Sequence, residues 1–387
     1  MLTQSGFFDG AAIFDRVAQD TGLSAYVDTA VRQRFIGIVE QFNEFAKPRP
    51  DALEGSLRDL QRIVEMRLQV ARDWAEYPEI LDEEIVQPMF VMGFPRGGTT
   101  LSQKLLSLDW GHRTPRYMDG LFPSPPPGLD PDADAEALRA TDIYTQHVID
   151  REPLALVSHP YFDKGAMAEA EDEWAACLDF RFVYPLHFQN TPNVPPTLMP
   201  EDPLAHFQFQ KKMMQQFQWK RPTRRWVGKG VLHHYIAPSL FEVFPDAIGV
   251  WCHRPIEEQI ASIISINNIF YQPIRGAGWE ENPTQMVEAM EAGVEAMINS
   301  PMMNDPRIYH LRFREMLKDP VAAIAAIYEA QGLEFTSYFE NRIRTWMEHP
   351  ANKVDRHGKF SHSPEQYGLD RKELERIFKP YKDKFGL

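Results

Sequence analysis

The chain has 387 residues, of which 43% are apolar and 12% aromatic, and this composition excludes a disordered protein. A formal net charge of −14 argues against nucleic acid as a partner, so any anionic ligand needs a local basic pocket. The sequence has no run near the ~20 apolar residues of a membrane span. It shows no secretory signal and has two cysteines, and we therefore expect a cytoplasmic protein.

Residues 1–85 predict a helical N-terminal region packed on the core. Apolar residues recur at helical spacing over 11–18, 31–45 and 53–77, and Pro78 ends the last stretch. Residues 86–387 then predict one α/β domain, with an acceptor-side insertion at about 120–215 that forms a lid.

The first predicted strand, 89–92, leads into a loop typical of phosphate binding. Gly97 and Gly98 allow the main chain to approach an anion closely, and Arg96 offers a guanidinium fork for its oxygens. Thr99, Thr100 and Leu101 open the next helix, whose N-terminus attracts negative charge and whose threonine hydroxyls are expected to cap it. Strand, loop and helix together predict a phosphate cradle.

The loop differs from the phosphate loop of nucleoside triphosphatases. That motif ends in Gly-Lys-Ser/Thr, whereas Thr99 follows Gly98 here and the basic residue comes earlier, at Arg96. A small-molecule kinase on this scaffold is therefore an alternative, but a nucleotide without a triphosphate–magnesium tail fits the loop better. No cluster of metal ligands stands out in the sequence, and we expect no metal.

The insertion predicts helices near 133–151 and 171–182. Glu171, Asp172 and Glu173 fit favourable charges at a helix N-terminus, with positioning of an acceptor as the alternative role. Aromatic residues are frequent nearby, and they either line an apolar acceptor pocket or belong to the core. They are Tyr161, Phe162, Trp174, Phe180, Phe182, Phe188 and Phe207.

Three further strands are predicted at 225–229, 248–252 and 308–312, and their alternation with helices predicts a parallel sheet. Arg254 follows the third predicted strand at the edge where open α/β sheets bind ligands, and Ser262 lies two helical turns further on.

Near the C-terminus, basic and titratable residues surround a glycine, a composition suited to an anion-binding loop or to a solvated run of charge. These residues are Arg356, His357, Gly358 and Lys359.

These motifs resemble those of sulfotransferases that use 3′-phosphoadenosine 5′-phosphosulfate (PAPS). Residues 95–101 are similar to the P-R-[ST]-G-T-T-L donor loop, 226–233 to a W-V-L-K-S-P-x-H segment, and 244–247 to F-P-D-A. The likeness extends from about residue 25 to the end. Two departures are Pro255 in place of Asp-Pro after Arg254, and the glycines that flank Lys229.

The resemblance implies a role for each motif. The donor loop, residues 96–101, would hold the 5′-phosphosulfate, and Arg254 with Ser262 the 3′-phosphate, over which residues 356–359 would close. Arg96 and Lys229 would be the cations at the leaving group. The resemblance implies Asp119 as the base, whereas chemistry near neutral pH favours His233; His159 is a third candidate.

We therefore expect a PAPS-dependent sulfotransferase with a parallel P-loop-type sheet flanked by helices. It would transfer the sulfuryl group without metal to the hydroxyl of a small-molecule acceptor of aromatic or lipid-like character, with an amine as second choice. The product would be adenosine 3′,5′-bisphosphate. A kinase and a non-catalytic protein that binds the donor or this product are the alternatives. The identity of the acceptor and the oligomeric state do not follow from the sequence.

Overall fold

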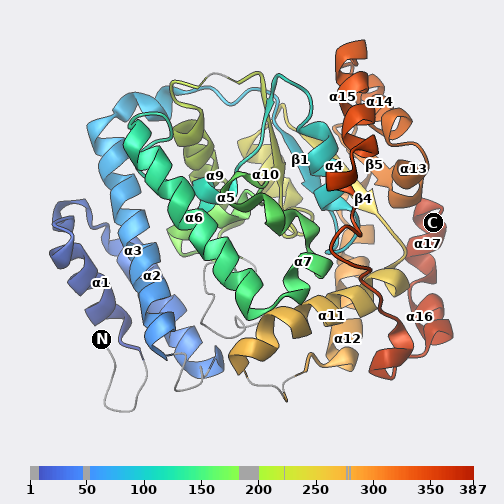
Figure 1. Ribbon diagram of the computed structural model, residues 1–387, viewed down its shortest axis with the longest axis horizontal. Coiled ribbons are helices and arrows are strands. Elements are labelled where there is room, and N and C mark those ends of the chain that lie inside the picture. The colour runs from blue at the N-terminus through green and yellow to red at the C-terminus, as the bar shows by residue number, and fades with distance from the viewer. Residues whose placement is uncertain (1–7, 47–52, 183–199, 222, 276–277, 279) are drawn as a thin grey trace.

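The computed structural model describes residues 8–46, 53–182, 200–221, 223–275, 278 and 280–387. Its α-helices, most of them labelled in Figure 1, are α1 (Gly10–Asp20), α2 (Thr29–Gln41), α3 (Leu53–Glu76), α4 (Thr99–Leu106), α5 (Tyr117–Leu121), α6 (Pro131–Arg151), α7 (Leu154–Ser158), α8 (Glu173–Ala176), α9 (Pro203–Gln218), α10 (Ala237–Val243), α11 (Ile256–Arg275), α12 (Pro283–Ile298), α13 (Phe313–Lys318), α14 (Pro320–Ala330), α15 (Ser337–Glu348), α16 (Arg371–Ile377) and α17 (Lys379–Phe385). No helix of these residues is both long and apolar enough to cross a membrane.

A five-stranded parallel sheet forms the centre of the fold. Its strands are β1 (Met89–Met92), β2 (His112–Arg113), β3 (Arg225–Lys229), β4 (Ile248–His253) and β5 (Ile308–Arg312). They lie in the order β2-β3-β1-β4-β5, and all pairs are parallel. The predicted fold class is confirmed, and only the two-residue strand β2 has no counterpart among the predicted strands.

Two of the N-terminal helices begin at aspartate caps. Asp9 accepts a hydrogen bond from the main chain of α1, and Asp28 accepts two from the main chain of α2, which satisfies N–H groups that a helix start leaves open. Helices α1, α2 and α3 lie side by side, as Figure 1 shows in blue, and the chain then enters β1 at the centre of the sheet.

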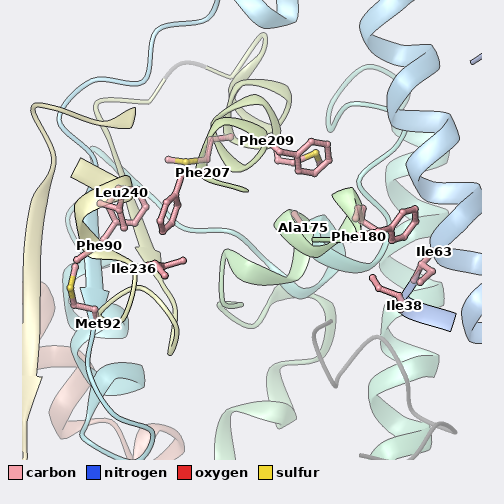
Figure 2. Close-up of a cluster of buried hydrophobic side chains, with 14 of the residues drawn as sticks. Ile38, Ile63, Phe90, Met92, Ala175, Phe180, Phe207, Phe209, Ile236 and Leu240 are labelled. Carbon is pink, nitrogen blue, oxygen red and sulfur yellow. The ribbon is translucent and has the colours of Figure 1, made fainter. Parts of the chain in front are cut away.

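One hydrophobic cluster joins this helical region to the sheet. It runs from Ile38 on α2 and Ile63 on α3 through Phe180 and Phe207 to Phe90 on β1, as Figure 2 shows. All five side chains are buried. Because burial of apolar surface is the main stabilising term in folding, the N-terminal helices share their stability with the sheet.

The insertion differs from its prediction in one helix. The helix expected at 171–182 is much shorter, because α8 (Glu173–Ala176) gives way to a 3-10 turn and Phe180 then takes a left-handed φ of 58°. For its aromatic residues the sequence left two roles open, an acceptor pocket or the core, and most of them lie in the core with at most 3% of their surface exposed. Phe188 lies outside the described residues. The core members are Phe162, Trp174, Phe180, Phe182 and Phe207.

Candidate active site

The loop between β1 and α4 has an unusual main-chain conformation. Arg96 has a φ of 67°, which residues with a Cβ rarely adopt, and Gly98 has a φ of 100° as the N-cap of α4. A Cβ at Gly98 would overlap with the ring of Phe313. No side chain caps α4, so the expectation that Thr99 and Thr100 cap it is wrong: both lie inside the helix, after its cap. The first N–H groups of α4 are therefore left for a ligand.

Arg96, Arg254 and Ser262 meet at this loop although more than 150 positions separate Arg96 from the other two. Arg96 donates from Nε to Ser262 Oγ at 3.0 Å, and Arg254 donates from Nη1 to the Arg96 carbonyl at 3.3 Å. Arg254 also pairs with Glu258 at 3.1 Å and lies over the ring of Phe313. The structure thus assembles the residues expected to hold two phosphates at the carboxyl ends of β1 and β4.

Arg96 has no carboxylate partner among the described residues. Its remaining hydrogen bond goes to the carbonyl of Ser158 at 3.2 Å, and none of the ion pairs found in the described part of the chain includes it. Burial, with a smaller contribution from Arg254, lowers the pKa of Arg96 to about 10. Because a half-buried cation without a counter-charge is only partly solvated, this position is suited to an anionic ligand.

The C-terminal basic loop reaches the same region. Arg356 forms two hydrogen bonds to Asp163, at 2.7 and 2.8 Å, and His357 approaches the same carboxylate at 2.9 Å. Lys359 is exposed, and further along the loop the ring of Phe360 lies 5.7 Å from the Arg96 guanidinium. The loop therefore borders the donor loop, although two of its basic side chains already have an acidic partner.

Lys229, the last residue of β3, links the donor loop to the insertion. Its Nζ lies 3.4 Å from Thr100 Oγ1 and 2.5 Å from Glu171 Oε1. The main chain of Asp172 bonds to the Lys229 carbonyl at 3.1 Å, which holds the acidic segment against the end of the strand. A cation and a carboxylate, both needed for transfer to a hydroxyl, thus lie beside the phosphate cradle.

His159 is half-buried at the same place. Desolvation, together with the positive charges of Arg96 and Lys229, lowers its pKa to about 3, so the imidazole is neutral at physiological pH. Its ring packs edge-on against Phe162, with the ring centres 5.7 Å apart. A neutral imidazole near two cations can accept a hydrogen bond, whereas its low pKa makes it a weak acceptor of protons.

Asp119 has a role in the start of α5. Its carboxylate accepts a 2.9 Å hydrogen bond from the main chain of Arg116 as part of a capping box. Burial raises its pKa, while Arg113, Arg116 and Arg221 oppose this rise. The charges that act on Asp119 come from these arginines rather than from Lys229 or Arg96.

His233 lies in a buried acidic cluster behind Lys229. Its Nε2 is 2.9 Å from Asp172, its Nδ1 is 3.6 Å from Glu173, and the ring is fully buried. Desolvation opposes protonation of this imidazole, but Asp172 and Glu173 outweigh it and raise the pKa of His233. Burial raises the pKa of Glu173 to about 8. Protons held in this cluster are shielded from solvent.

The sequence does not place the parts of the site that come from the insertion. Its pattern fits Glu171 to a helix terminus, with acceptor positioning as the alternative, makes His159 the third candidate for the base, and carries no signal for Asp163. The sequence carried one signal, the acidic triplet 171–173, but the 58 positions between Glu171 and Lys229 left its location open.

Comparison with known proteins gives the family and the fold of the chain. The chain is similar to sulfotransferase STF9 from Mycobacterium avium (26% identity, 96% of this chain and 95% of that chain, TM-score 0.80). It has the fold of sulfotransferase STF1 from Mycobacterium tuberculosis H37Rv (20% identity, 95% and 97% coverage, TM-score 0.71). A search of curated protein sequences gave no match. The sulfotransferase family model matches residues 88–337, and the chain therefore belongs to the sulfotransferase family.

Proposed function

We propose that this chain is a PAPS-dependent sulfotransferase that transfers the sulfuryl group to an acceptor hydroxyl, with an amine as second choice, and releases adenosine 3′,5′-bisphosphate. The observation that carries the proposal is the meeting of Arg96 and Arg254 beside the start of α4, where Arg96 is half-buried and has no carboxylate partner among the described residues. A ligand with two phosphate groups would supply the missing negative charge. Family membership supports the same reaction class.

The residues present fit such a donor, which would bring an activated sulfuryl group on a phosphate leaving group. The N–H groups at the start of α4 and the Arg96 guanidinium would hold the phosphosulfate end. Arg254 and Ser262, already within reach of Arg96, would hold the 3′-phosphate. The loop 356–359 would close over this end. Arg356 and His357, which now bind Asp163, would then bind the phosphate either in addition to that carboxylate or in place of it.

Arg96 and Lys229 would stabilise the negative charge that develops on the leaving phosphate. Both are fixed in place, Arg96 by Ser262 and Ser158, and Lys229 by Thr100 and Glu171. Preorganised cations lower a barrier most when they need no rearrangement during the reaction. Because a sulfuryl group carries less charge than a phosphoryl group, we propose that these two side chains act without metal.

For the base we favour Glu171 over the two residues expected from the sequence. Glu171 lies at the leaving-group cation, whereas Asp119 serves a helix cap and His233 is fully buried. The acceptor O–H proton would pass to the Glu171 carboxylate as the new S–O bond forms and the bond to the leaving phosphate breaks. His159, neutral beside the same cations, would orient the acceptor hydroxyl.

We propose a small acceptor of aromatic or lipid-like character, and buried rings near Glu171 would form the floor of its site. Tyr117 stacks on Trp174 with ring centres 4.6 Å apart and meets Phe162 edge-on at 5.5 Å. The negative charge of Glu171 contributes to the raised pKa of Tyr117, after burial as the main cause, so the phenol keeps its proton. We also propose a cytoplasmic location, which fits the two buried free cysteines.

Product release tests the proposal directly. The protein would be incubated with PAPS, a chelator and a panel of phenols and lipid alcohols, and adenosine 3′,5′-bisphosphate would be measured by chromatography. We expect release that depends on one acceptor class and continues in the chelator. Release of the bisphosphate with no acceptor preference, or transfer only from ATP with Mg²⁺, would contradict the proposal. Binding of PAPS without turnover would support a non-catalytic protein instead.

A further inference from the structure

A second basic site lies outside the proposed donor and acceptor site. A cleft of about 640 Å³ opens between α2, α3, α9 and α10, and none of the donor-loop residues lines it. Five basic side chains line this cleft against three acidic ones, although the whole chain carries a net charge of −14. The basic residues are Arg34, Arg67, Arg181, Lys211 and Lys212.

The topology separates this cleft from the donor loop. Glu242 and Val243 line it from the last turn of α10, and the chain then enters β4 at Ile248, the amino end of that strand. The donor loop follows β1 at the opposite, carboxyl edge of the same parallel sheet. A ligand in the cleft would therefore be distinct from the sulfuryl donor.

Arg67 is the residue that indicates a missing anion. Both oxygens of Asp179 already bind other arginines, Oδ1 to Arg34 at 2.7 Å and Oδ2 to Arg181 at 2.8 Å. Arg67 stays 3.7 Å from the same carboxylate, and within the described part of the chain its Nε has no hydrogen-bond partner. Only 8% of this residue's surface is exposed, and desolvation lowers the pKa of Arg67, so the folded protein bears the cost of a poorly compensated cation.

Asp28, the other acidic residue that acts on Arg67, does not supply the missing carboxylate partner. Asp28 acts on it electrostatically but accepts two main-chain hydrogen bonds at the start of α2, and that capping role lowers the pKa of Asp28. Three arginines thus share one buried carboxylate. An incoming carboxylate or phosphate could bind Arg67 through its guanidinium fork.

Apolar surface adjoins the cations. The Arg67 guanidinium lies 5.9 Å from the ring of Trp74 and 5.3 Å from that of Phe209, and Lys212 Nζ is 5.6 Å from Trp74. The apolar side chains of Val31 and Leu204 also line the cleft. The rings attract a cation but accept no strong hydrogen bond, and they offer contact to an alkyl or aromatic ligand body.

We propose that this cleft binds an anionic amphiphile, a molecule with a carboxylate or phosphate head and an apolar body. The head pairs with Arg67 and the neighbouring basic side chains, and the body lies against Trp74 and Phe209. Two kinds of ligand fit this description, a fatty carboxylate and a phosphorylated lipid fragment. They differ in the charge of the head group.

Calorimetric titration tests the cleft with decanoate, decyl phosphate, decanol and inorganic phosphate, each below its aggregation limit and with the donor site saturated by adenosine 3′,5′-bisphosphate. We expect decanoate or decyl phosphate to bind at a site that is weakened in Arg67→Met, whereas decanol, which suits the proposed acceptor site, should bind that variant and the unchanged protein equally. The tighter of the two anions identifies the source, carboxylate or phosphate. An equal loss of decanol binding in Arg67→Met, equal binding of inorganic phosphate, or no binding by either decyl anion at 1 mM (roughly the weak limit for a specific ligand) would overturn the proposal.

Variants locate the site. Arg67→Met should weaken binding of the decyl anion about tenfold or more through lost charge-assisted hydrogen bonds, without lowering the melting temperature, because the cation lacks a close partner. Should that variant fail to fold, exposed Lys212→Gln should still weaken binding, roughly two- to fivefold. Arg344→Met, a surface arginine on α15 outside both sites, is the matched control and should leave decyl binding unchanged. Unchanged affinity in the Arg67 and Lys212 variants would contradict the assignment.

Discussion

The two halves of the proposed site are built in different ways. We call the half with Arg96 and Arg254 the proposed donor edge, and the half with Glu171 and His159 the proposed acceptor side. The donor edge follows strands directly: Arg96 and Arg254 each come within four residues of the end of a strand in one parallel sheet. The acceptor side is assembled from the insertion, where short helices and turns bring Glu171 and His159 to Lys229. Residues that follow parallel strands necessarily meet at one edge, whereas the insertion depends on packing alone.

This difference has a functional consequence. The donor edge has a fixed main chain, with a strained Arg96 and a closely packed Gly98, and would suit one unvarying ligand. The acceptor side rests on side chains from separate segments, so its shape can vary without disturbing the sheet. We therefore expect substitutions on the two sides to separate donor binding from turnover.

The largest expected effect is on the acceptor side. Glu171→Gln should lower turnover by roughly 10²–10⁴-fold, because the amide cannot take the acceptor proton, while affinity for adenosine 3′,5′-bisphosphate stays within about threefold. Initial rates with PAPS and calorimetry on the same preparation measure both quantities.

Asp119→Asn and His233→Asn are the matched comparisons, because each removes one of the bases expected from the sequence. If Glu171 is the base, the loss in Glu171→Gln exceeds that in either comparison. A loss of turnover in Asp119→Asn with donor binding intact, and near-normal turnover in Glu171→Gln, would return the role to Asp119.

The next effect concerns the rigidity of the donor edge. Gly98→Ala should lower the free energy of unfolding by roughly 3 kcal/mol, because the new Cβ meets the Phe313 ring at a left-handed φ. Gly332→Ala is the control: its φ is also positive, but nothing lies within 4 Å of its Cβ, so about 1 kcal/mol is expected. Denaturant unfolding measures both, and equal losses would mean that the contact with Phe313 is unimportant.

Donor binding should depend on Arg254. Arg254→Ala should weaken binding of adenosine 3′,5′-bisphosphate by about 2 kcal/mol or more through lost charge-assisted hydrogen bonds. Arg314→Ala removes the other arginine that pairs with Glu258, at 2.6 Å, and should change affinity far less. Equal losses in a calorimetric comparison would assign the effect to Glu258 and remove Arg254 from the site.

The smallest expected effect is a pH dependence of stability. The pKa of Glu173 is raised to about 8 in the folded protein from 4.5, so between these values folding takes up a proton. The free energy of unfolding should therefore fall as pH rises through this window, by at most about 1.4 kcal/mol per unit from this group. Glu173→Gln should flatten the slope between pH 6 and 8, and exposed Glu40→Gln should not. An unchanged slope in Glu173→Gln would show that Glu173 is ionised.

The sheet and the donor edge could be predicted because local patterns determine them. Four apolar runs gave β1, β3, β4 and β5, with β4 one residue longer than expected, whereas β2 has two residues and no apolar run. Arg254 directly follows β4 and Ser262 lies on α11, and this spacing brings both residues to Arg96.

The acceptor side could not be predicted in the same way. Glu171 fits a helix terminus by its local charge, and its contact with Lys229 depends on how the insertion folds over β3. The aromatic residues of the insertion are equally suited to a core and to a pocket, and burial shows that most of them belong to the core. Composition does not distinguish these roles, because both place rings against apolar surface.

The central claim is that the uncapped helix and the two arginines form a metal-independent site for a nucleotide bisphosphate. It is tested most directly by calorimetric titration of the whole chain with adenosine 3′,5′-bisphosphate in a chelator, and separately with ATP and Mg²⁺. Micromolar binding of the bisphosphate without metal, lost in Arg254→Ala and kept in Arg314→Ala, is the expected result. Binding of the triphosphate alone, and only with Mg²⁺, would contradict the account.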